Sequence, residues 1–334
     1  MKRNRLLALL LGILLGGLAV GLSLDEEEYL PSGTDADLYW ETETTVPNMM
    51  EQSAETDAYR GESETEEVPE SLSKMEVHFL DVGQGDATLI LNDGHAMLID
   101  AGDNSKGTAI QLYLTKCGVE TLDYLILTHT DADHIGGADV ILTKFEVDTV
   151  FMGDFPKENA TYRDVLQALS YRGLTFSTPE VGSVYSLGDA YFTIVAPNGT
   201  YGDPNNTSIG LLLCKGDTTF LFTGDAEGKA EEDMLTNGLS LQADVYQVGH
   251  HGSSTSSSEG FLEAVAPTYA VISCAEGNSY GHPHAETLNT LRAMGVLVFR
   301  TDEQGSIVAV SDGSKITFNC APSESWQAGE PTGY

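Results

Sequence analysis

The sequence is poor in cysteine and in positive charge. Its 334 residues include four cysteines, with no CxxC pair and no zinc-finger spacing to a histidine, so a cysteine-based metal site is not expected. Sixteen lysines and arginines stand against 51 acidic residues, which gives a formal net charge of −35. Such a surface repels a polyanion, and no stretch interleaves aromatic and basic residues as a stacking groove would. We therefore expect no stable binding of duplex nucleic acid.

Two segments at the start of the chain are unsuited to a folded core. Residues 1–24 have a basic beginning and an apolar stretch from Leu6 to Leu24, which is typical of a signal peptide or of an N-terminal membrane anchor. Residues 25–74 carry 16 acidic side chains against two basic ones, which predicts an acidic disordered linker. We expect an exported protein that is secreted or anchored through residues 6–24 on the outer face of the cytoplasmic membrane.

Regular structure is predicted from residue 75 to residue 320. The runs MEVHFLD, DATLILN and HAMLID, separated by Gly and Asn-Asp-Gly, indicate consecutive antiparallel strands. Helical spacing follows at about Lys106 to Cys117 and again at Ala160 to Tyr171, and strands alternate with helices to the end. The pattern predicts a single α/β domain, followed by a loose tail at 321–334.

The strongest chemical signal is LTHTDADHIGG, just past an apolar strand. It places His129, Asp131, Asp133 and His134 within six positions. Buried unpaired carboxylates are costly, so two of them beside two imidazoles make sense if a cation compensates their charge. The alternative interpretation is an exposed polar loop with incidental histidines.

This motif resembles the HxHxDH motif of the metallo-β-lactamase superfamily, with Asp131 at the second histidine position. Four further motifs strengthen the resemblance: LDVGQGDATLI at Leu80 to Ile90, LIDAG at Leu98 to Gly102, FTGD at Phe222 to Asp225 and VGHHGSS at Val248 to Ser254. Together they are similar to the extracellular hydrolase domain of the competence DNA-uptake channel family. The resemblance implies a single-domain αββα sandwich. The many membrane helices of that family are missing, so direct coupling to a DNA pore is not expected.

The resemblance also implies two divalent metal ions, Zn²⁺ or Mn²⁺. His129 and Asp131 would hold one ion, Asp133 and His134 the other, and Asp225 would bridge them. Two cations about 3.5–4 Å apart would activate a shared hydroxide. Asp133 is also predicted to be catalytic. Read alone, Asp225 is also a plausible helix N-cap.

The HHG motif and a later histidine are the remaining candidates for metal binding and catalysis. We expect His250 to complete the second metal site and His251 to assist the reacting group, with the reverse assignment left open. His282 resembles a position used near the site in the competence branch and is predicted to be catalytic.

The third ligand position of the superfamily has no histidine in this chain. Asn205 or Asn206 occupies the matching region, and such oxygen ligands shift the preference from zinc alone toward Mn²⁺ or a mixture. The residues predicted to bind substrate are Gln84, Asn206 and Ser253. Asp100 is predicted to accept a hydrogen bond from a ligand histidine and so to orient it, and Asp81 is predicted to support the metal ligands in the same way.

These features predict an exported metal-dependent hydrolase, similar to a phosphodiesterase or nuclease. Its substrate would be a phosphodiester or another small hydrolysable molecule, with single-stranded DNA among the candidates. Two alternatives are a hydrolase of the lactonase or β-lactamase type and a surface protein that retains the fold without turnover. Retained metal binding without hydrolysis would favour the last.

Overall fold

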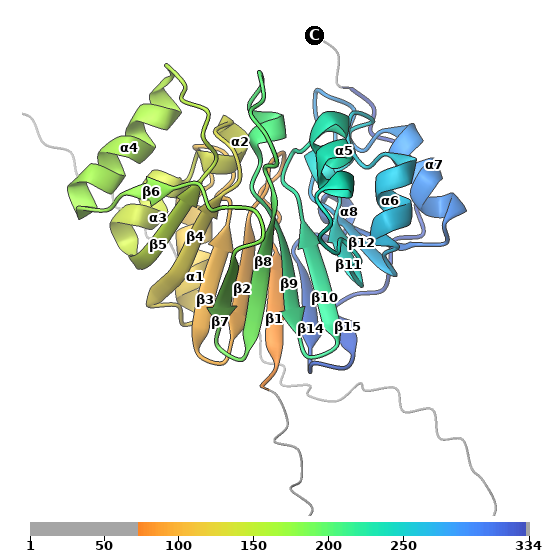
Figure 1. The fold of residues 1–334 in the computed structure, drawn as a ribbon, viewed down its shortest axis with the longest axis horizontal. Helices are drawn as coiled ribbons and strands as arrows, with labels where there is room; N and C mark the ends of the chain where they lie inside the picture. Colours follow the sequence, from red (N-terminus) through yellow and green to blue (C-terminus); the bar gives the residue numbers. More distant parts are fainter. Residues whose placement is uncertain (1–72, 332–334) are drawn as a thin grey trace, which may run out of the picture. The chain divides into compact units, whose positions relative to one another are not determined.

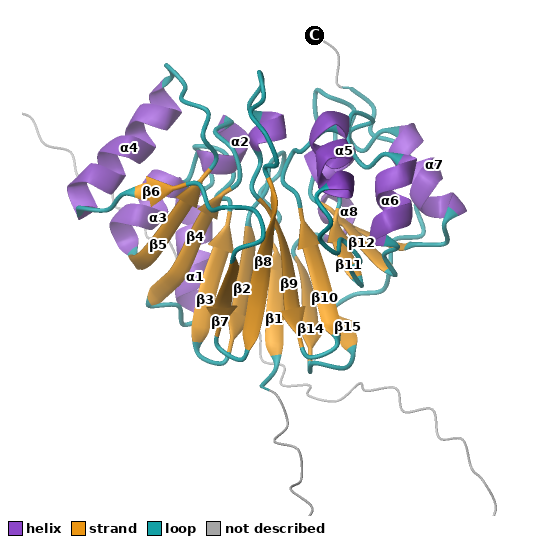
Figure 2. Cartoon of the chain, viewed as in Figure 1, coloured by secondary structure: helices purple, strands orange, loops and turns teal. Residues whose placement is uncertain are grey.

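Two β-sheets form the centre of the computed structural model, which describes residues 73–331 (Figures 1 and 2). The first sheet has eight strands in the order β15-β14-β1-β2-β3-β4-β5-β6. Their bounds are β1 (Met75–Phe79), β2 (Thr88–Asn92), β3 (His95–Ile99), β4 (Thr121–Leu127), β5 (Glu146–Met152), β6 (Phe176–Ser177), β14 (Ile307–Ser311) and β15 (Ile316–Phe318).

The second sheet has seven strands in the order β13-β12-β11-β10-β9-β8-β7. Their bounds are β7 (Val184–Leu187), β8 (Ala190–Ala196), β9 (Gly210–Lys215), β10 (Thr218–Phe222), β11 (Val245–Gln247), β12 (Tyr269–Ile272) and β13 (Leu297–Arg300). Strands β10 to β13 run parallel to one another, whereas β7 to β10 form an antiparallel meander.

Helices cover the outer faces of both sheets. The α-helices are α1 (Gly107–Lys116), α2 (Ala132–Ile135), α3 (Ala138–Lys144), α4 (Ala160–Arg172), α5 (Gly228–Thr236), α6 (Glu259–Val265), α7 (Ala285–Ala293) and α8 (Thr301–Gln304). Two short 3₁₀ helices are η1 (Asn205–Thr207) and η2 (Gly249–Gly252). Helices α1, α3 and α4 pack on the first sheet, and α5, α6 and α7 on the second (Figure 2).

Three apolar cores hold these layers together. One lies between the two sheets, and one lies between each sheet and its helices. A sheet or helix buries only one apolar face or stripe in a two-layer arrangement, so three cores correspond to four layers. This confirms the predicted αββα sandwich, and all described residues belong to one compact unit.

The sequence pattern accounts for the first strands. Strands β1, β2 and β3 pair antiparallel in succession, as the alternation predicts. Asp93 and Gly94, with φ of 52° and 80°, form the tight turn between β2 and β3, where two residues of positive φ are required. Strands β3, β4 and β5 then run parallel, and the helices between them provide the necessary crossovers.

The segment after Cys320 differs from the predicted loose tail. Up to residue 331 it lies against the domain: the carbonyl of Gln327 accepts a 2.7 Å bond from the Arg300 guanidinium, and Gly329 N–H donates to the Pro283 carbonyl at 2.9 Å. The Trp326 side chain packs on the core of the second sheet. Apolar burial and backbone hydrogen bonds therefore hold this segment, although its sequence shows no periodicity.

Residues 1–24 and nearly all of 25–74 lie outside the described residues, so the predicted signal or anchor and the predicted linker do too. Within residues 73–331 no helix has the length and apolarity needed to span a bilayer. The four cysteines lie in this described part, and all are free thiols.

Candidate metal centre

Chemical groups from both sheets meet at one edge of the sandwich, the upper edge in Figure 1. Asp100 follows β3, and His129 follows β4. Asp225 follows β10, and His251 lies in η2, directly after β11. Because parallel strands end at the same edge, residues far apart in sequence come together there.

Four buried side-chain atoms at this edge have no hydrogen-bond partner. They are Nε2 of His129, His134 and His251, and Oδ1 of Asp225. Each unsatisfied buried polar group costs about 1–3 kcal/mol, so natural structures rarely leave several together. Imidazole nitrogens and a carboxylate oxygen are ordinary ligands of zinc and manganese. The residues present therefore fit a divalent cation.

Asp225 is the centre of this group and is 3 % exposed. Its Oδ1 lies 3.3 Å from Nε2 of His134, and its Oδ2 lies 3.6 Å from Nε2 of His251 and 3.8 Å from Nε2 of His129. Asp86, His134, Asp225 and His251 each offer one ligand atom, and these four atoms lie within 4.8 Å of one another. This spacing allows all four to contact a single ion.

Hydrogen bonds from behind orient two of the imidazoles. Nδ1 of His134 lies 2.8 Å from Oδ2 of Asp100, which is fully buried and also accepts bonds from Thr128. Nδ1 of His251 lies 2.9 Å from the Ser273 carbonyl, which can only accept. Both rings therefore carry their proton on Nδ1 and present the Nε2 lone pair to the cluster.

The backbone is adapted to the cluster at two loops. His250 and His251 have φ of 51° and 56°, a left-handed conformation that is unusual outside glycine and turns the η2 segment toward Asp225. In the β1–β2 loop, a Cβ on Gly85 would lie 2.3 Å from the Asp133 carbonyl oxygen. Glycine therefore allows the close approach in which Asp86 N–H donates to that carbonyl at 3.2 Å.

The electrostatics of the cluster favour a bound cation. Burial would raise the pKa of Asp225, but the imidazoles of His134 and His251 hold that pKa well below its usual range. Burial and the neighbouring His134 lower the pKa of His129 well below its ordinary value, so its lone pair is available. Burial opposes charge on His134 and His251, yet the carboxylates, led by Asp225, raise the pKa of both. A metal ion satisfies these carboxylates in place of those protons.

The comparisons with known proteins agree with this geometry. Residues 80–276, more than half of the chain, match the family model described as the metallo-beta-lactamase superfamily. The chain belongs to this superfamily. It is 32 % identical over 256 residues to ComE operon protein 3 of Bacillus subtilis and 34 % identical over 238 residues to Recombination protein 2 of Haemophilus influenzae. Each match covers 70 % of this chain, but it covers only 33 % and 28 % of the relatives, so the chain spans about a third of their length.

A solved structure with the same fold is the metallo-beta-lactamase fold protein YhfI from Bacillus subtilis. It has a TM-score of 0.50 and 12 % identity, and the match covers 72 % of this chain and all of that one. This likeness shows the fold alone. The predicted resemblance to the metallo-β-lactamase superfamily and to competence proteins is confirmed by the family match and by the named relatives.

Within the metallo-β-lactamase motif, the four predicted ligands lie in different surroundings. His129 and His134 are fully buried and point Nε2 into the cluster. Asp133 places Oδ2 3.5 Å from Nε2 of His251. Asp131 begins helix α2 and forms an ion pair with Lys157. Asp133 thus faces an imidazole of the cluster, whereas Asp131 is paired with a lysine from another loop.

The two histidines of the HHG motif lie in different surroundings. We expected His250 as the ligand, but the structure favours His251, which is buried and has its Nε2 unpartnered. His250 has a side chain that is 21 % exposed, and its Nδ1 contacts Thr255 and Glu227. Its Nε2 lies 3.6 Å from Asp225, so it stays at the open side of the cluster. The difference lies in burial and in hydrogen-bond partners, which the sequence does not reveal.

Asn206 does not occupy the place of a third ligand. Its amide oxygen accepts bonds from the N–H groups of Glu227 and Ala230, at 3.2 and 3.1 Å, and its amide nitrogen donates to Asp203. It therefore caps the start of helix α5, where unpaired N–H groups need acceptors. The prediction that Asn206 binds substrate or metal is not supported by this position.

Two further predicted residues also serve local structure. Asp81 accepts a bond from Gly83 N–H at 3.1 Å and stabilises its own loop, with no contact to a ligand histidine. Ser253 is 3 % exposed, and its hydroxyl pairs with Thr255 at 3.1 Å. Both side chains form hydrogen bonds with residues two positions further along the chain. Such local bonds are common in Gly- and Ser-rich loops.

Gln84 and His282 face each other beside the cluster. The amide nitrogen of Gln84 lies 3.4 Å from Nδ1 of His282, and its buried Oε1 has no partner. Burial, together with His251 and His250, lowers the pKa of His282 to about 3, so its ring is neutral. His282 also stacks on Tyr280, which is 62 % exposed at the rim. These two residues stay candidates for contact with a substrate.

Sequence reasoning placed Asp86 in a loop able to approach a ligand but gave it no role, and it missed Lys157. Asp86 is 4 % exposed and contacts His251, with 3.6 Å between Oδ1 and Nδ1. Its signal was an acidic residue at the end of a Gly-flanked loop, directly before a strand. Lys157 had no signal beyond its position in a loop after β5, and only the tertiary structure places it beside Asp131.

Proposed function

We propose that this chain is an exported metal-dependent phosphodiesterase with nuclease-like activity. The superfamily fold and the buried Asp and His cluster support metal-dependent hydrolysis in general. The observation that carries the proposal is the set of four unpartnered donor atoms at one open edge of the sandwich. A site of orphaned, oriented ligands is costly to keep unless it binds a cation.

When bound there, a divalent ion polarises a phosphoryl oxygen and lowers the pKa of water toward neutrality. The chain's residues have separate parts around it. His134, Asp225 and His251 hold the ion, with Asp86 or Asp133 as a further oxygen ligand, and Asp100 orients His134. His250, partly exposed beside the cluster, would donate a proton or hydrogen bond to the reacting group. The expected metals are Zn²⁺ or Mn²⁺, because imidazole and carboxylate ligands suit both.

A phosphodiester substrate is favoured by the names of the relatives, and the charge of the chain narrows the choice among phosphodiesters. The relatives carry the names ComE operon protein 3, Competence protein ComA and Recombination protein 2, which concern competence and recombination. The net charge of −35 disfavours long-range attraction of a polyanion, so short or single-stranded phosphodiesters are better candidates than duplex DNA.

Export is proposed on the sequence of residues 1–24 alone, because these lie outside the described residues. Fractionation of cells that express the full chain, or a chain without residues 1–24, would test it. Recovery of the full chain outside the cytoplasm and of the shortened chain inside it supports export. Equal recovery of both chains in the cytoplasm contradicts it.

The activity test uses the full chain, stripped of metal and reloaded with Mn²⁺ or Zn²⁺. The substrates are bis-p-nitrophenyl phosphate, single-stranded DNA and a chromogenic β-lactam. Asp133→Ala is the site variant, and Asp164→Ala, at an exposed position of α4, is the matched control. Metal-dependent phosphodiester cleavage that Asp133→Ala alone abolishes supports the proposal. Turnover of the β-lactam alone would favour a lactamase-type hydrolase, and metal binding without any turnover would favour a non-catalytic protein.

A further inference from the structure

A lysine lies beside the metal cluster. It contacts Asp131, which the superfamily pattern predicts to be a metal ligand. Lys157 belongs to the loop between β5 and α4, and its Nζ donates to Oδ1 of Asp131 in an ion pair. The same Oδ1 lies 3.9 Å from Nε2 of His129. The ammonium group therefore neutralises the carboxylate that was expected to share a metal ion with His129.

Asn206, one of the two asparagines expected near that ion, is also engaged. Asn206 directs its amide oxygen to the start of α5, with bonds to Glu227 N–H and Ala230 N–H. The amide nitrogen of Asn205 contacts the Glu227 carboxylate at 3.4 Å. Apart from the central Asp225, His129 is then the one residue on this side of the cluster with an unpartnered ligand atom.

The opposite side of the cluster is complete. Asp86, His134, Asp225 and His251 bring four ligand atoms within 4.8 Å of one another. The two imidazoles are oriented by the hydrogen bonds that their Nδ1 atoms donate to Asp100 and to the Ser273 carbonyl. Four ligands within this range match the usual coordination number of a zinc site. The two halves of the cluster are therefore unequal in donors and in charge.

We propose that the chain binds one divalent ion tightly and that the Lys157 ammonium takes the place of the second. This proposal rests on the metal binding proposed above, but it does not depend on the identity of the substrate. A fixed ammonium repels a second cation and occupies the carboxylate that would hold it. A negatively charged substrate oxygen would then lie between the ion on one side and Lys157 on the other.

The test is the number of metal ions per chain, measured by elemental analysis after desalting and by calorimetric titration of the metal-free full chain with Mn²⁺ or Zn²⁺. The variants are Lys157→Met, Lys157→Arg and Asp131→Asn. Lys229→Met is the matched control, because Lys229 forms an exposed ion pair with Asp233 on α5. Circular dichroism of each variant establishes that it is folded.

We expect one tightly bound ion in the unaltered chain and in Lys157→Arg, Asp131→Asn and Lys229→Met. Lys157→Met should gain a second ion, because Asp131 then joins His129 and Asp225. Two ions in the unaltered chain, falling to one in Asp131→Asn, would overturn the proposal. One ion in Lys157→Met would also overturn it, since the lysine would then not be what excludes the second ion. Absence of any bound ion would refute the metal site itself, whereas a failed substrate assay leaves these counts unaffected.

Discussion

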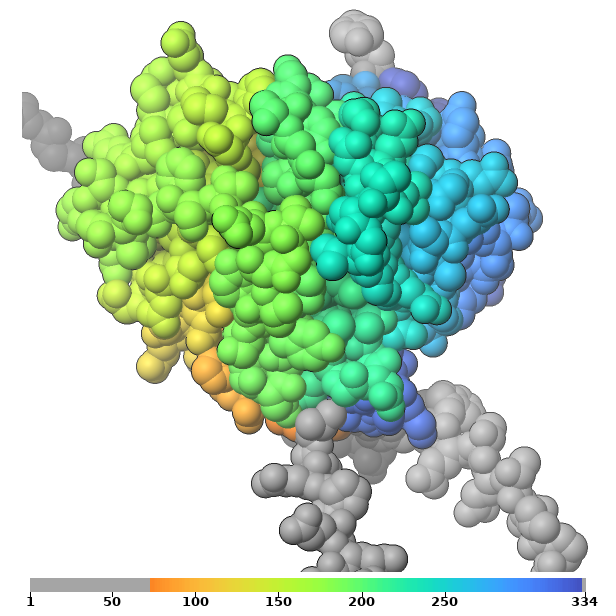
Figure 3. All heavy atoms as spheres, viewed as in Figure 1, coloured from red at the N-terminus to blue at the C-terminus, as the bar shows by residue number. Residues whose placement is uncertain are grey.

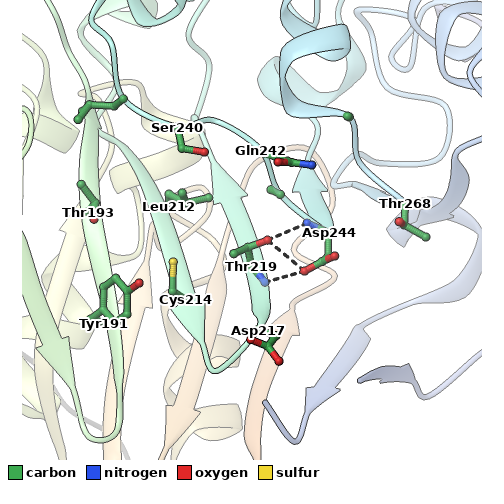
Figure 4. Close-up of a pocket in the computed structure, with 13 residues that line it drawn as sticks. Tyr191, Thr193, Leu212, Cys214, Asp217, Thr219, Ser240, Gln242, Asp244 and Thr268 are labelled. Atoms are coloured by element: carbon green, nitrogen blue, oxygen red, sulfur yellow. Dashed lines mark hydrogen bonds between the residues drawn. The ribbon is translucent and has the colours of Figure 1, made fainter. Parts of the chain in front are cut away.

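Two regions of this molecule differ in how their polar groups are satisfied. On the outer face of the second sheet lies a groove of about 680 Å³, lined in part by Tyr191, Cys214, Thr219 and Asp244 (Figure 4). In it, Oδ2 of Asp244 accepts bonds from Thr219 N–H at 2.8 Å and from its hydroxyl at 3.0 Å. At the metal centre, by contrast, four buried donor and acceptor atoms are left without partners.

Unpartnered buried polar atoms identify the functional site better than the volume of a groove does. The groove lies over β8, β9 and β10 (Figure 4), in the part of the chain drawn green to teal in the space-filling view (Figure 3), and Tyr191 there is 48 % exposed. Its hydrogen bonds join β10 to the start of β11 and thus serve the sheet. An unsatisfied buried group requires an explanation that a satisfied groove does not. We therefore assign chemistry to the metal centre and structure to the groove.

The largest effect is expected from a comparison of two aspartates, one at the metal centre and one in the groove. Asp225→Asn removes the central carboxylate with almost no change in shape, and we expect phosphodiester hydrolysis to fall by about 10³-fold or more, which corresponds to about 4 kcal/mol. Asp244→Asn should leave turnover within about twofold and lower stability by about 1 kcal/mol. Rates on bis-p-nitrophenyl phosphate and urea unfolding measure both. Equal losses of activity in the two variants would remove the distinction.

Removal of the metal ion should lower the free energy of unfolding. This loss should depend on the metal centre and not on the groove. An ion at about 100 times its Kd adds about 2.7 kcal/mol to the free energy of unfolding, or roughly 5–10 °C in Tm for a domain of this size. Thermal unfolding of the chelated and the reloaded chain measures this shift. Asp244→Asn should show the same shift as the unaltered chain, and Asp225→Asn should show almost none. A Tm that is independent of metal in the unaltered chain would contradict a bound ion.

Asp100 connects the fold to the cluster and should give an intermediate effect. Asp100→Asn keeps the shape but weakens the acceptor that orients His134, so we expect metal affinity to fall by about 10- to 100-fold. Competition with a chromogenic chelator measures this affinity. Thr88→Val is a suitable comparison, since it removes a buried hydroxyl that bonds Gln247 and contacts no ligand. An Asp100→Asn affinity equal to that of Thr88→Val would show that this orientation is unimportant.

The smallest effect is expected at the exposed side of the groove. Tyr191→Thr keeps a strand-favouring residue and should change stability by no more than about 0.5 kcal/mol, with unchanged KM and kcat. Denaturant titration and steady-state kinetics would measure this. A raised KM would mean that the groove contacts substrate, and the comparison drawn above would then fail.

The sequence by itself determined much of this protein. Strand alternation around Asp93 and Gly94 predicted the antiparallel beginning, and helical spacing predicted α1 and α4, because these patterns are local. The motif from His129 to His134 predicted a metal cluster, since so many ligand types crowd together in few other contexts.

The tertiary structure decided what depends on direction and distance. His251 is the more buried histidine of the HHG motif and has an unpartnered Nε2, and Asn206 is committed to helix α5. Asp86 and Lys157 reach the site from separate loops, which no spacing in the sequence reveals. A pattern gives the residue types available for binding. Whether each lone pair is free or already paired follows only from the packing of distant segments.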